Sequence, residues 1–163
     1  MKTLKDAFEH LLNDVYYAEN ALVKALPEMA EAAGSAALKS AFRDHLAETK
    51  KQIKILKDVF AACGFEVKGE KCDAIEGLIK EGGTILAEGS GIALDASLLA
   101  LAQAVEHYEI ARYGTLREWA KALDLNEPAA MISEILDMEK ACNSKLTGIA
   151  VAEINKPSRA KAA

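Results

Sequence analysis

Four long stretches of this chain repeat apolar residues at intervals of three and four, the spacing that aligns them along one face of an α-helix. The stretches cover residues 4–33, 36–64 and 92–123, and the chain from residue 126 onwards. Only 3 prolines occur in 163 residues, and alanine, leucine, lysine and glutamate are abundant, which favours helix throughout. The pattern predicts an all-α protein whose four long helices pack along their apolar faces.

The region between the second and third stretches has a different character. Residues 65–91 are rich in glycine and hold one short apolar segment at 74–86. A connection of this length can span a helical bundle, so it predicts an antiparallel four-helix bundle with a long crossover that contains a short extra helix. We expect residues 1–155 to form a single domain and residues 156–163 to form a frayed tail.

Each of the four predicted helices carries a carboxylate near the middle of its apolar face: Glu19, Glu48, Glu106 and Glu139. In the second helix, the position on the apolar face belongs either to Glu48 or to Thr49. An ionised carboxylate cannot be buried in an apolar core without a partner. Because the midpoints of antiparallel helices meet at one level, we expect the four carboxylates to converge in the core, where a pair of metal ions would neutralise them.

Two further residues extend this set. His45 precedes Glu48 by three positions and Glu109 follows Glu106 by three, so each shares a helix face with its neighbour. Carboxylates together with an imidazole suit iron or manganese, which take oxygen and nitrogen ligands. His45 is therefore interpreted either as a ligand or as a hydrogen-bonded core histidine. Glu109 is interpreted either as a ligand or as the partner of one.

A metal-free interpretation stays open beside the metal centre. The carboxylates would then pair with lysine, arginine or tyrosine side chains in a polar layer of the core. Tyr113 could orient a carboxylate through its hydroxyl, although packing of its ring in the core is the favoured role. Cys142 lies on the apolar face of the fourth helix, where a buried apolar thiol is favoured over a metal ligand.

Composition and charge exclude other classes of function. The net charge of -5 and the pI near 5.3 argue against nucleic-acid binding. No apolar run reaches the length of about 18 residues that a membrane span needs, and the N-terminal segment lacks the apolar centre of a signal peptide. The 3 cysteines show no CxxC spacing. We therefore expect a cytoplasmic protein with reduced thiols, with neither a nucleic acid nor a membrane as partner.

Four segments of the chain resemble the YciF-type family of ferritin-like, stress-associated bacterial proteins, which are related in fold to rubrerythrin and ferritin. These segments are DVYYAENAL (14–22), HLAETKKQI (45–53), VEHYEIARYGTL (105–116) and MEKACNSKLT (138–147). The third is the most specific, and the resemblance extends over nearly the whole chain. It implies a ferritin-like four-helix bundle, a homodimer and a di-metal centre of iron or manganese.

The resemblance also implies roles for individual residues. Glu19 and Glu106 match the metal carboxylates of the first and third helices, which we expect to bind one ion each. Glu48 and Glu139 match the carboxylates that bridge the two ions. The ferritin-like pattern Glu-x-x-His is absent, however: the second helix carries His45-x-x-Glu48 in reversed order, and Cys142 follows Glu139 by three positions.

Three classes of function follow from the resemblance. The first is a di-metal protein that reacts with oxygen or peroxide, the second is an iron-binding or iron-sequestering protein, and the third is a structural stress protein that keeps the bundle without the metal. A homodimer is predicted as well, since four apolar residues near helix ends and in the crossover are expected to form an exposed patch. These residues are Phe60, Phe65, Ile75 and Trp119.

Overall fold

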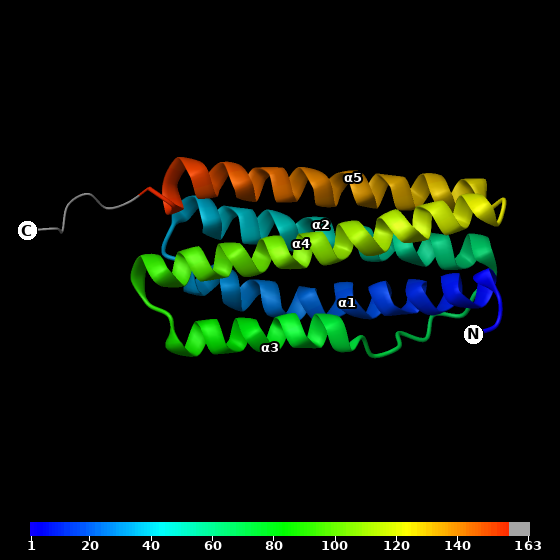
Figure 1. The fold of residues 1–163 in the computed structure, drawn as a ribbon, viewed down its shortest axis with the longest axis horizontal. Coiled ribbons are helices and arrows are strands. Elements are labelled where there is room, and N and C mark those ends of the chain that lie inside the picture. Colours follow the sequence, from blue (N-terminus) through cyan, green and yellow to red (C-terminus); the bar gives the residue numbers. More distant parts are fainter. Residues whose placement is uncertain (157–163) are drawn as a thin grey trace, which may run out of the picture.

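The computed structural model describes residues 1–156, which form five α-helices and a short terminal π-helix (Figure 1). The helices are α1 (Leu4–Ala32), α2 (Ala36–Cys63), α3 (Asp73–Glu88), α4 (Gly91–Ala122), α5 (Asn126–Ile149) and the π-helix η1 (Ala150–Ile154). No β-strand occurs between residues 1 and 156, so the all-α prediction is confirmed. Apart from Lys156, the predicted frayed tail lies outside the described residues.

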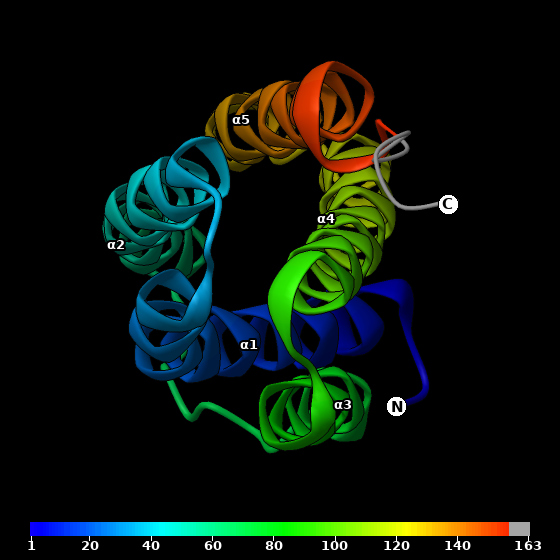
Figure 2. The same cartoon turned by 90° about the vertical axis from the view of Figure 1, so that its left-hand side faces the viewer.

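Four of the helices form the bundle, and α3 lies outside it. Seen end-on, α1, α2, α5 and α4 surround a common axis, while α3 packs on the outer side of α1 and α4 (Figure 2). The side view shows α2 and α4 running in one direction and α1 and α5 in the other (Figure 1). The connection that contains α3 carries the chain back along the bundle, so α2 and α4 are parallel although they are consecutive bundle helices.

Local side-chain chemistry determines where the helices begin and end. At the start of α1, the Asp6 N–H donates to Thr3 Oγ1 and the Thr3 N–H donates to Asp6 Oδ2, both at 3.1 Å, which forms a capping box. Ser35 caps α2, and Gly64 ends that helix in the left-handed conformation with a φ of 66°. At α5, Leu125 occupies the cap position without a side-chain hydrogen bond, and Asn126 is already helical.

The turn between α1 and α2 is attached to α4 by a buried carboxylate. The N–H groups of Gly34 and Ser35 donate to the two oxygens of Asp95, at 2.7 and 2.8 Å. Asp95 is 7% exposed. These bonds stabilise the buried carboxylate and supply partners for N–H groups at the start of α2.

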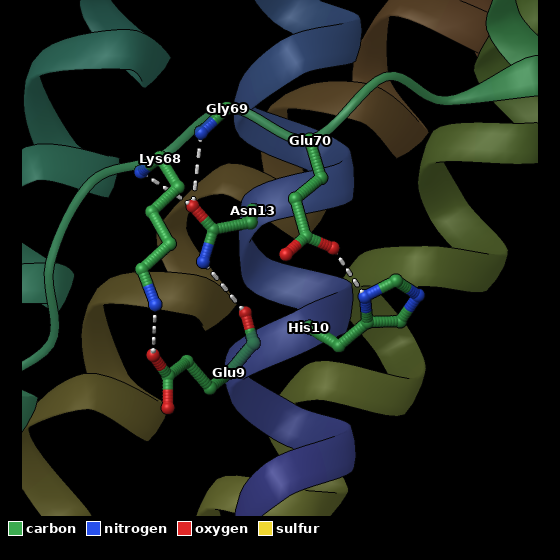
Figure 3. A network of polar contacts seen from close by, with 6 residues as sticks. All are labelled: Glu9, His10, Asn13, Lys68, Gly69 and Glu70. Atoms are coloured by element: carbon green, nitrogen blue, oxygen red, sulfur yellow. Dashed lines mark hydrogen bonds and ion pairs between the residues drawn. The ribbon is translucent and has the colours of Figure 1, made fainter. Parts of the chain in front are cut away.

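The crossover is held against α1 by Asn13, which is 1% exposed (Figure 3). Its Oδ1 accepts from the N–H groups of Lys68 and Gly69 at 2.8 and 3.0 Å, and its Nδ2 donates to the Glu9 carbonyl at 3.0 Å. Gly69 has a φ of 64°, which a glycine adopts without strain. We call Asn13 and its three backbone partners the crossover clamp.

The apolar core consists of two clusters, one toward each end of the bundle. One is built around residues such as Leu22, Phe42 and Leu98, and the other around residues such as Phe8 and Leu56. Between the two clusters the inward-facing positions of the four bundle helices are polar. A single polar layer is therefore enclosed between two apolar clusters.

The predicted apolar patch is wrong in part. Phe60 and Ile75 are 1% and 0% exposed and belong to the core, while Phe65 and Trp119 are half-buried. Ile75 is covered because α3 packs its apolar face onto the bundle. The homodimer stays a prediction. No helix within residues 1–156 has both the length and the apolar composition needed to cross a membrane.

Candidate metal centre

The polar layer in the middle of the bundle takes side chains from all four of its helices. They are Glu19 from α1, His45, Thr49 and Gln52 from α2, Glu106 and Glu109 from α4, and Glu139 from α5, and none of them is more than 3% exposed. Within α2 and within α4 they are three or four residues apart, which places them on one inward face of each helix. We call these seven residues the carboxylate layer.

Four members of the carboxylate layer converge closely. One donor atom from each of His45, Glu106, Glu109 and Glu139 lies within 4.8 Å of the donor atoms of the others. His45 Nδ1 is 3.3 Å from Glu106 Oε1, and His45 Nε2 is 3.8 Å from Glu109 Oε2. Three carboxylates and an imidazole therefore face one small volume from three helices. Cys142 forms a second group of this kind with His45 and Glu106.

Most polar atoms of the layer have no hydrogen-bond partner within residues 1–156. These atoms are Glu19 Oε2, His45 Nε2, Gln52 Oε1, both oxygens of Glu106, both oxygens of Glu109, and Glu139 Oε2. Leaving one buried polar atom unpaired costs about 1–3 kcal/mol, and more for a charged group. A cation bound among these atoms would supply the missing partner for several of them at once.

Three hydrogen bonds hold the surrounding side chains in place. Gln52 Nε2 donates to Glu139 Oε1 at 2.6 Å, and the Tyr113 hydroxyl donates to Glu19 Oε1. Thr49 Oγ1 donates to the His45 carbonyl at 2.9 Å, which satisfies its hydroxyl within α2. The first two bonds leave Oε2 of Glu139 and Oε2 of Glu19 without a partner, so these carboxylates are oriented without being saturated.

Burial and mutual repulsion shift the protonation of the layer. Burial raises the pKa of Glu19 to about 8, partly opposed by the Tyr113 hydroxyl, and raises the pKa of Glu106 to about 7. Burial, with the neighbouring carboxylates, raises the pKa of Glu109 and of Glu139 well above the usual range. Burial lowers the pKa of His45 to about 4, so its imidazole is neutral and able to bind a metal.

The structure places Glu48 outside this cluster. Its side chain is half-buried on the side of α2 that faces α5, and Thr49 takes the inward position, so the structure selects Thr49 from the two alternatives for the apolar face. Successive residues are turned by about 100° around a helix, which accounts for the difference. Burial raises the pKa of Glu48, and Lys145 opposes that shift.

The other predicted residues lie in the layer, but the structure adds partners that the sequence analysis did not assign. Gln52 is one of these partners, since its amide donates to Glu139. Tyr113 is fully buried, and it both packs in the core and donates to Glu19, so it has both of the roles that the sequence offers for it. Cys142 Sγ lies within 4.8 Å of donor atoms of His45 and Glu106, whereas the sequence favours a buried apolar thiol at this position.

The donors of the layer fit a divalent transition metal. Carboxylate oxygens and a neutral imidazole suit iron and manganese, and their unpartnered atoms face one another in a volume closed by apolar residues on both sides. Like-charged carboxylates at this spacing repel one another unless protons or cations neutralise them. The layer therefore needs either protons or cations to neutralise its carboxylates.

Comparison with known proteins gives close relatives over the whole chain. The family model described as domain of unknown function DUF892 matches residues 3–158. The Escherichia coli (strain K12) protein YciF is 42% identical over 164 residues, which is 99% of each chain. The crystal structure of the E. coli stress protein YciF superposes with a TM-score of 0.92 at 42% identity, covering 96% of this chain and 99% of that chain.

Two further solved structures are similar. YcfI from Rhodopseudomonas palustris, for which a structural role has been suggested, has a TM-score of 0.87 at 45% identity, with 90% of this chain and 94% of that chain covered. A protein from Xanthomonas campestris pv. campestris has a TM-score of 0.72 at 19% identity, with 92% of both chains covered. At that identity the likeness concerns the fold alone.

Proposed function

The chain belongs to the DUF892 family and is a YciF-type protein with a ferritin-like helical bundle, and from this premise we propose that its carboxylate layer binds a pair of iron or manganese ions. His45, Glu106, Glu109 and Glu139 are the proposed ligands of the first ion. Glu19, with its free Oε2, is proposed to contribute to the second together with Glu139. The single observation that supports the proposal most strongly is the set of buried, unpartnered donor atoms that converge from three helices.

A pair of such ions would supply redox chemistry toward oxygen or peroxide. The protein's own residues would orient the ligands and exclude water. Gln52 and Tyr113 hold two carboxylates in fixed orientations through hydrogen bonds. The apolar clusters on both sides keep bulk water out of the layer. Because the E. coli relative is described as a stress protein, we extend a role in bacterial stress to this chain.

Metal content tests the proposal directly. We expect protein purified without chelators, after growth with iron or manganese, to hold up to two ions per chain by elemental analysis. Glu106→Gln and Glu139→Gln keep side-chain size but remove the charge, so both should lose most of the bound metal. Glu134→Gln is the matched control, because Glu134 lies on α5 with a side chain that is 53% exposed. Consumption of peroxide by the metal-bound protein then separates redox activity from iron storage.

A second candidate is a metal-free structural protein, the role suggested for the R. palustris relative. The observation in its favour is the raised pKa of Glu19 and of Glu106, which lets these acids stay protonated and neutral near pH 7. The layer would then be a set of buried carboxylic acids that share protons. Wild-type protein that binds neither Fe²⁺ nor Mn²⁺ in an equilibrium titration would contradict the metal proposal and support this candidate.

A further inference from the structure

A small cavity of about 100 Å³ opens between α2 and α5 beside the carboxylate layer. It is lined by Asp44, His45 and Glu48 from α2 and by Ala141, Cys142 and Lys145 from α5. Its volume corresponds to about three water molecules at roughly 30 Å³ each. The cavity is therefore large enough for a small ion that has lost part of its hydration shell.

The floor of this cavity is part of the proposed centre. His45 and Cys142 line the cavity and also form, with Glu106, a group of donor atoms within 4.8 Å of one another. His45 is 3% exposed, and its Nε2 has no hydrogen-bond partner among the described residues. A cation that reached the floor would therefore meet a free donor of the layer directly.

The mouth of the cavity is charged. Lys145 Nζ lies 2.6 Å from Asp44 Oδ2, and both side chains are about half exposed, at 49% and 54%. Glu48 also lines the cavity and is half-buried, and its charge acts on both Lys145 and Glu106. Two carboxylates therefore flank the opening, and the ammonium group of Lys145 neutralises one of them.

Apolar clusters cover the layer along the bundle axis, and two larger cavities lie away from it. A cleft of about 440 Å³ between α1 and α3 and a cavity of about 280 Å³ beside the crossover are larger, but no residue of the carboxylate layer lines either of them. The small α2–α5 cavity is thus a short route from solvent to the donors.

We propose that divalent cations enter the centre through the α2–α5 cavity, that Asp44 and Glu48 attract and hold the cation at its mouth, and that the Lys145–Asp44 ion pair closes it. The inference rests on the proposed function. Carboxylates at the mouth of a cleft raise the local concentration of cations, whereas the Lys145 ammonium repels them. Since an exposed ion pair contributes little to stability, it opens readily and allows passage.

Uptake kinetics test this route. Metal-free protein would be mixed with Co²⁺, a spectroscopic substitute for iron and manganese, and its visible absorption followed by stopped flow at 0.15 M salt. We expect Lys145→Met to take up Co²⁺ several-fold faster, because it leaves both mouth carboxylates unpaired. Lys51→Met is the matched control, since the Lys51–Glu134 pair also joins α2 to α5, at 2.7 Å, but lies outside the cavity. Its uptake rate should equal that of the wild type.

Two further variants probe the opening itself. Ala141→Phe places a ring at the exposed mouth and should slow uptake several-fold, with an unchanged final Co²⁺ content. Glu48→Gln should also slow uptake without loss of content, whereas a bridging Glu48, as the sequence predicts, would lose metal at equilibrium. Wild-type rates in Lys145→Met and in Ala141→Phe at full occupancy would overturn the route and leave the proposed centre intact. A wild type that takes up no Co²⁺ would overturn both.

Discussion

Two buried polar regions of this bundle differ in how completely their atoms are hydrogen-bonded. In the crossover clamp, Asn13 is 1% exposed and uses both its amide oxygen and its amide nitrogen, with three backbone partners. In the carboxylate layer, Glu106 is 0% exposed and neither of its oxygens has a partner within the described chain. Burial is equal, but the clamp is satisfied and the layer is not.

The difference distinguishes buried polar atoms that stabilise the fold from buried polar atoms that are free to bind a ligand. A fully satisfied buried network stabilises one arrangement of the chain, whereas a partly satisfied one costs stability. The clamp positions the crossover, and thereby α3, against α1 (Figure 3). The unpartnered oxygens of the layer do not stabilise the fold. The apolar clusters on either side offset the free-energy cost of burying them. An arrangement that breaks the rules of core formation in this way is typical of a binding site.

Of the changes considered, metal removal should have the largest effect on the stability of the carboxylate layer. Bound ions would satisfy the layer as fully as the clamp, so chelation should lower the melting temperature and re-addition of metal should restore it. At a free metal concentration about 100-fold above Kd, the stabilisation is about 2.7 kcal/mol, or roughly 5–10 °C for a chain of this size. Differential scanning calorimetry measures the shift. An unchanged melting temperature after confirmed metal loss would count against the centre.

Asn13→Ala removes the side chain at the centre of the crossover clamp and should lower the free energy of unfolding. It leaves the N–H groups of Lys68 and Gly69 and the Glu9 carbonyl without their partner, at a cost of about 2–3 kcal/mol. Asn20→Ala is the matched control on the same helix, because half-buried Asn20 makes one hydrogen bond, to the Tyr16 carbonyl, and should lose less than about 1 kcal/mol. Urea unfolding of both metal-free variants gives the two values. Equal losses would show that the clamp contributes nothing beyond an ordinary side-chain bond.

The fold could be predicted from the sequence further than the site could. Helix periodicity, the Thr3 cap and the glycine-rich connection are local signals, and the structure has a helix at each predicted position. The apolar face of α2 left Glu48 and Thr49 as alternatives, because a pattern of threes and fours does not resolve a rotation of about 100°. The packing of α2 against α1 and α5 turns Thr49 inward.

Hydrogen bonds between side chains of different helices could not be predicted from the sequence for a similar reason. Gln52 bonds Glu139 from a position 87 residues away, and Tyr113 bonds Glu19 across 94 residues. No spacing rule connects such pairs, since they depend on the relative height of two helices. The same holds for Asn13, which reads as an unremarkable polar residue within a helix until the crossover passes over it.

In the metal-free protein, the pH dependence of stability distinguishes the carboxylate layer, which titrates, from the crossover clamp, which does not. The pKa of Glu19 is raised to about 8 and that of Glu106 to about 7, so between their ordinary value of 4.5 and those values the folded state binds more protons than the unfolded state. Stability therefore falls as pH rises through this range. His45, whose pKa is lowered to about 4, acts in the opposite direction, but only below its ordinary value of 6.5.

The window from pH 6.5 to pH 8 isolates the carboxylates. There the free energy of unfolding of metal-free protein should fall, with Glu19 alone contributing about 1–2 kcal/mol. Glu19→Gln should remove that part of the slope, while Asn13→Ala should keep it, because the clamp contains no titrating group. Urea unfolding at several pH values provides the measurement. A wild-type slope that matches Glu19→Gln would show that Glu19 is already ionised in the folded protein.

Tyr113→Phe is expected to have the smallest effect, because it removes one hydrogen bond, which satisfies one of the two oxygens of a carboxylate in the layer. The phenylalanine keeps the fully buried ring and removes the hydroxyl that donates to Glu19 Oε1, so metal-free stability should fall by about 1 kcal/mol. Tyr16→Phe is the control on a half-buried ring that packs edge-on against Phe60 at 5.8 Å, and it should leave stability unchanged.

The same variant also decides whether Glu19 belongs to the centre. If Glu19 binds the second ion, loss of the hydroxyl that orients it should weaken the affinity for that ion by about 10-fold and leave the first ion unaffected. Titration of metal-free protein with Mn²⁺, followed by electron paramagnetic resonance of the free ion, resolves the two affinities. Two affinities equal to those of the wild type, together with the expected loss of stability, would assign the Tyr113–Glu19 pair to the fold alone. The centre would then be confined to His45 and the carboxylates of α4 and α5.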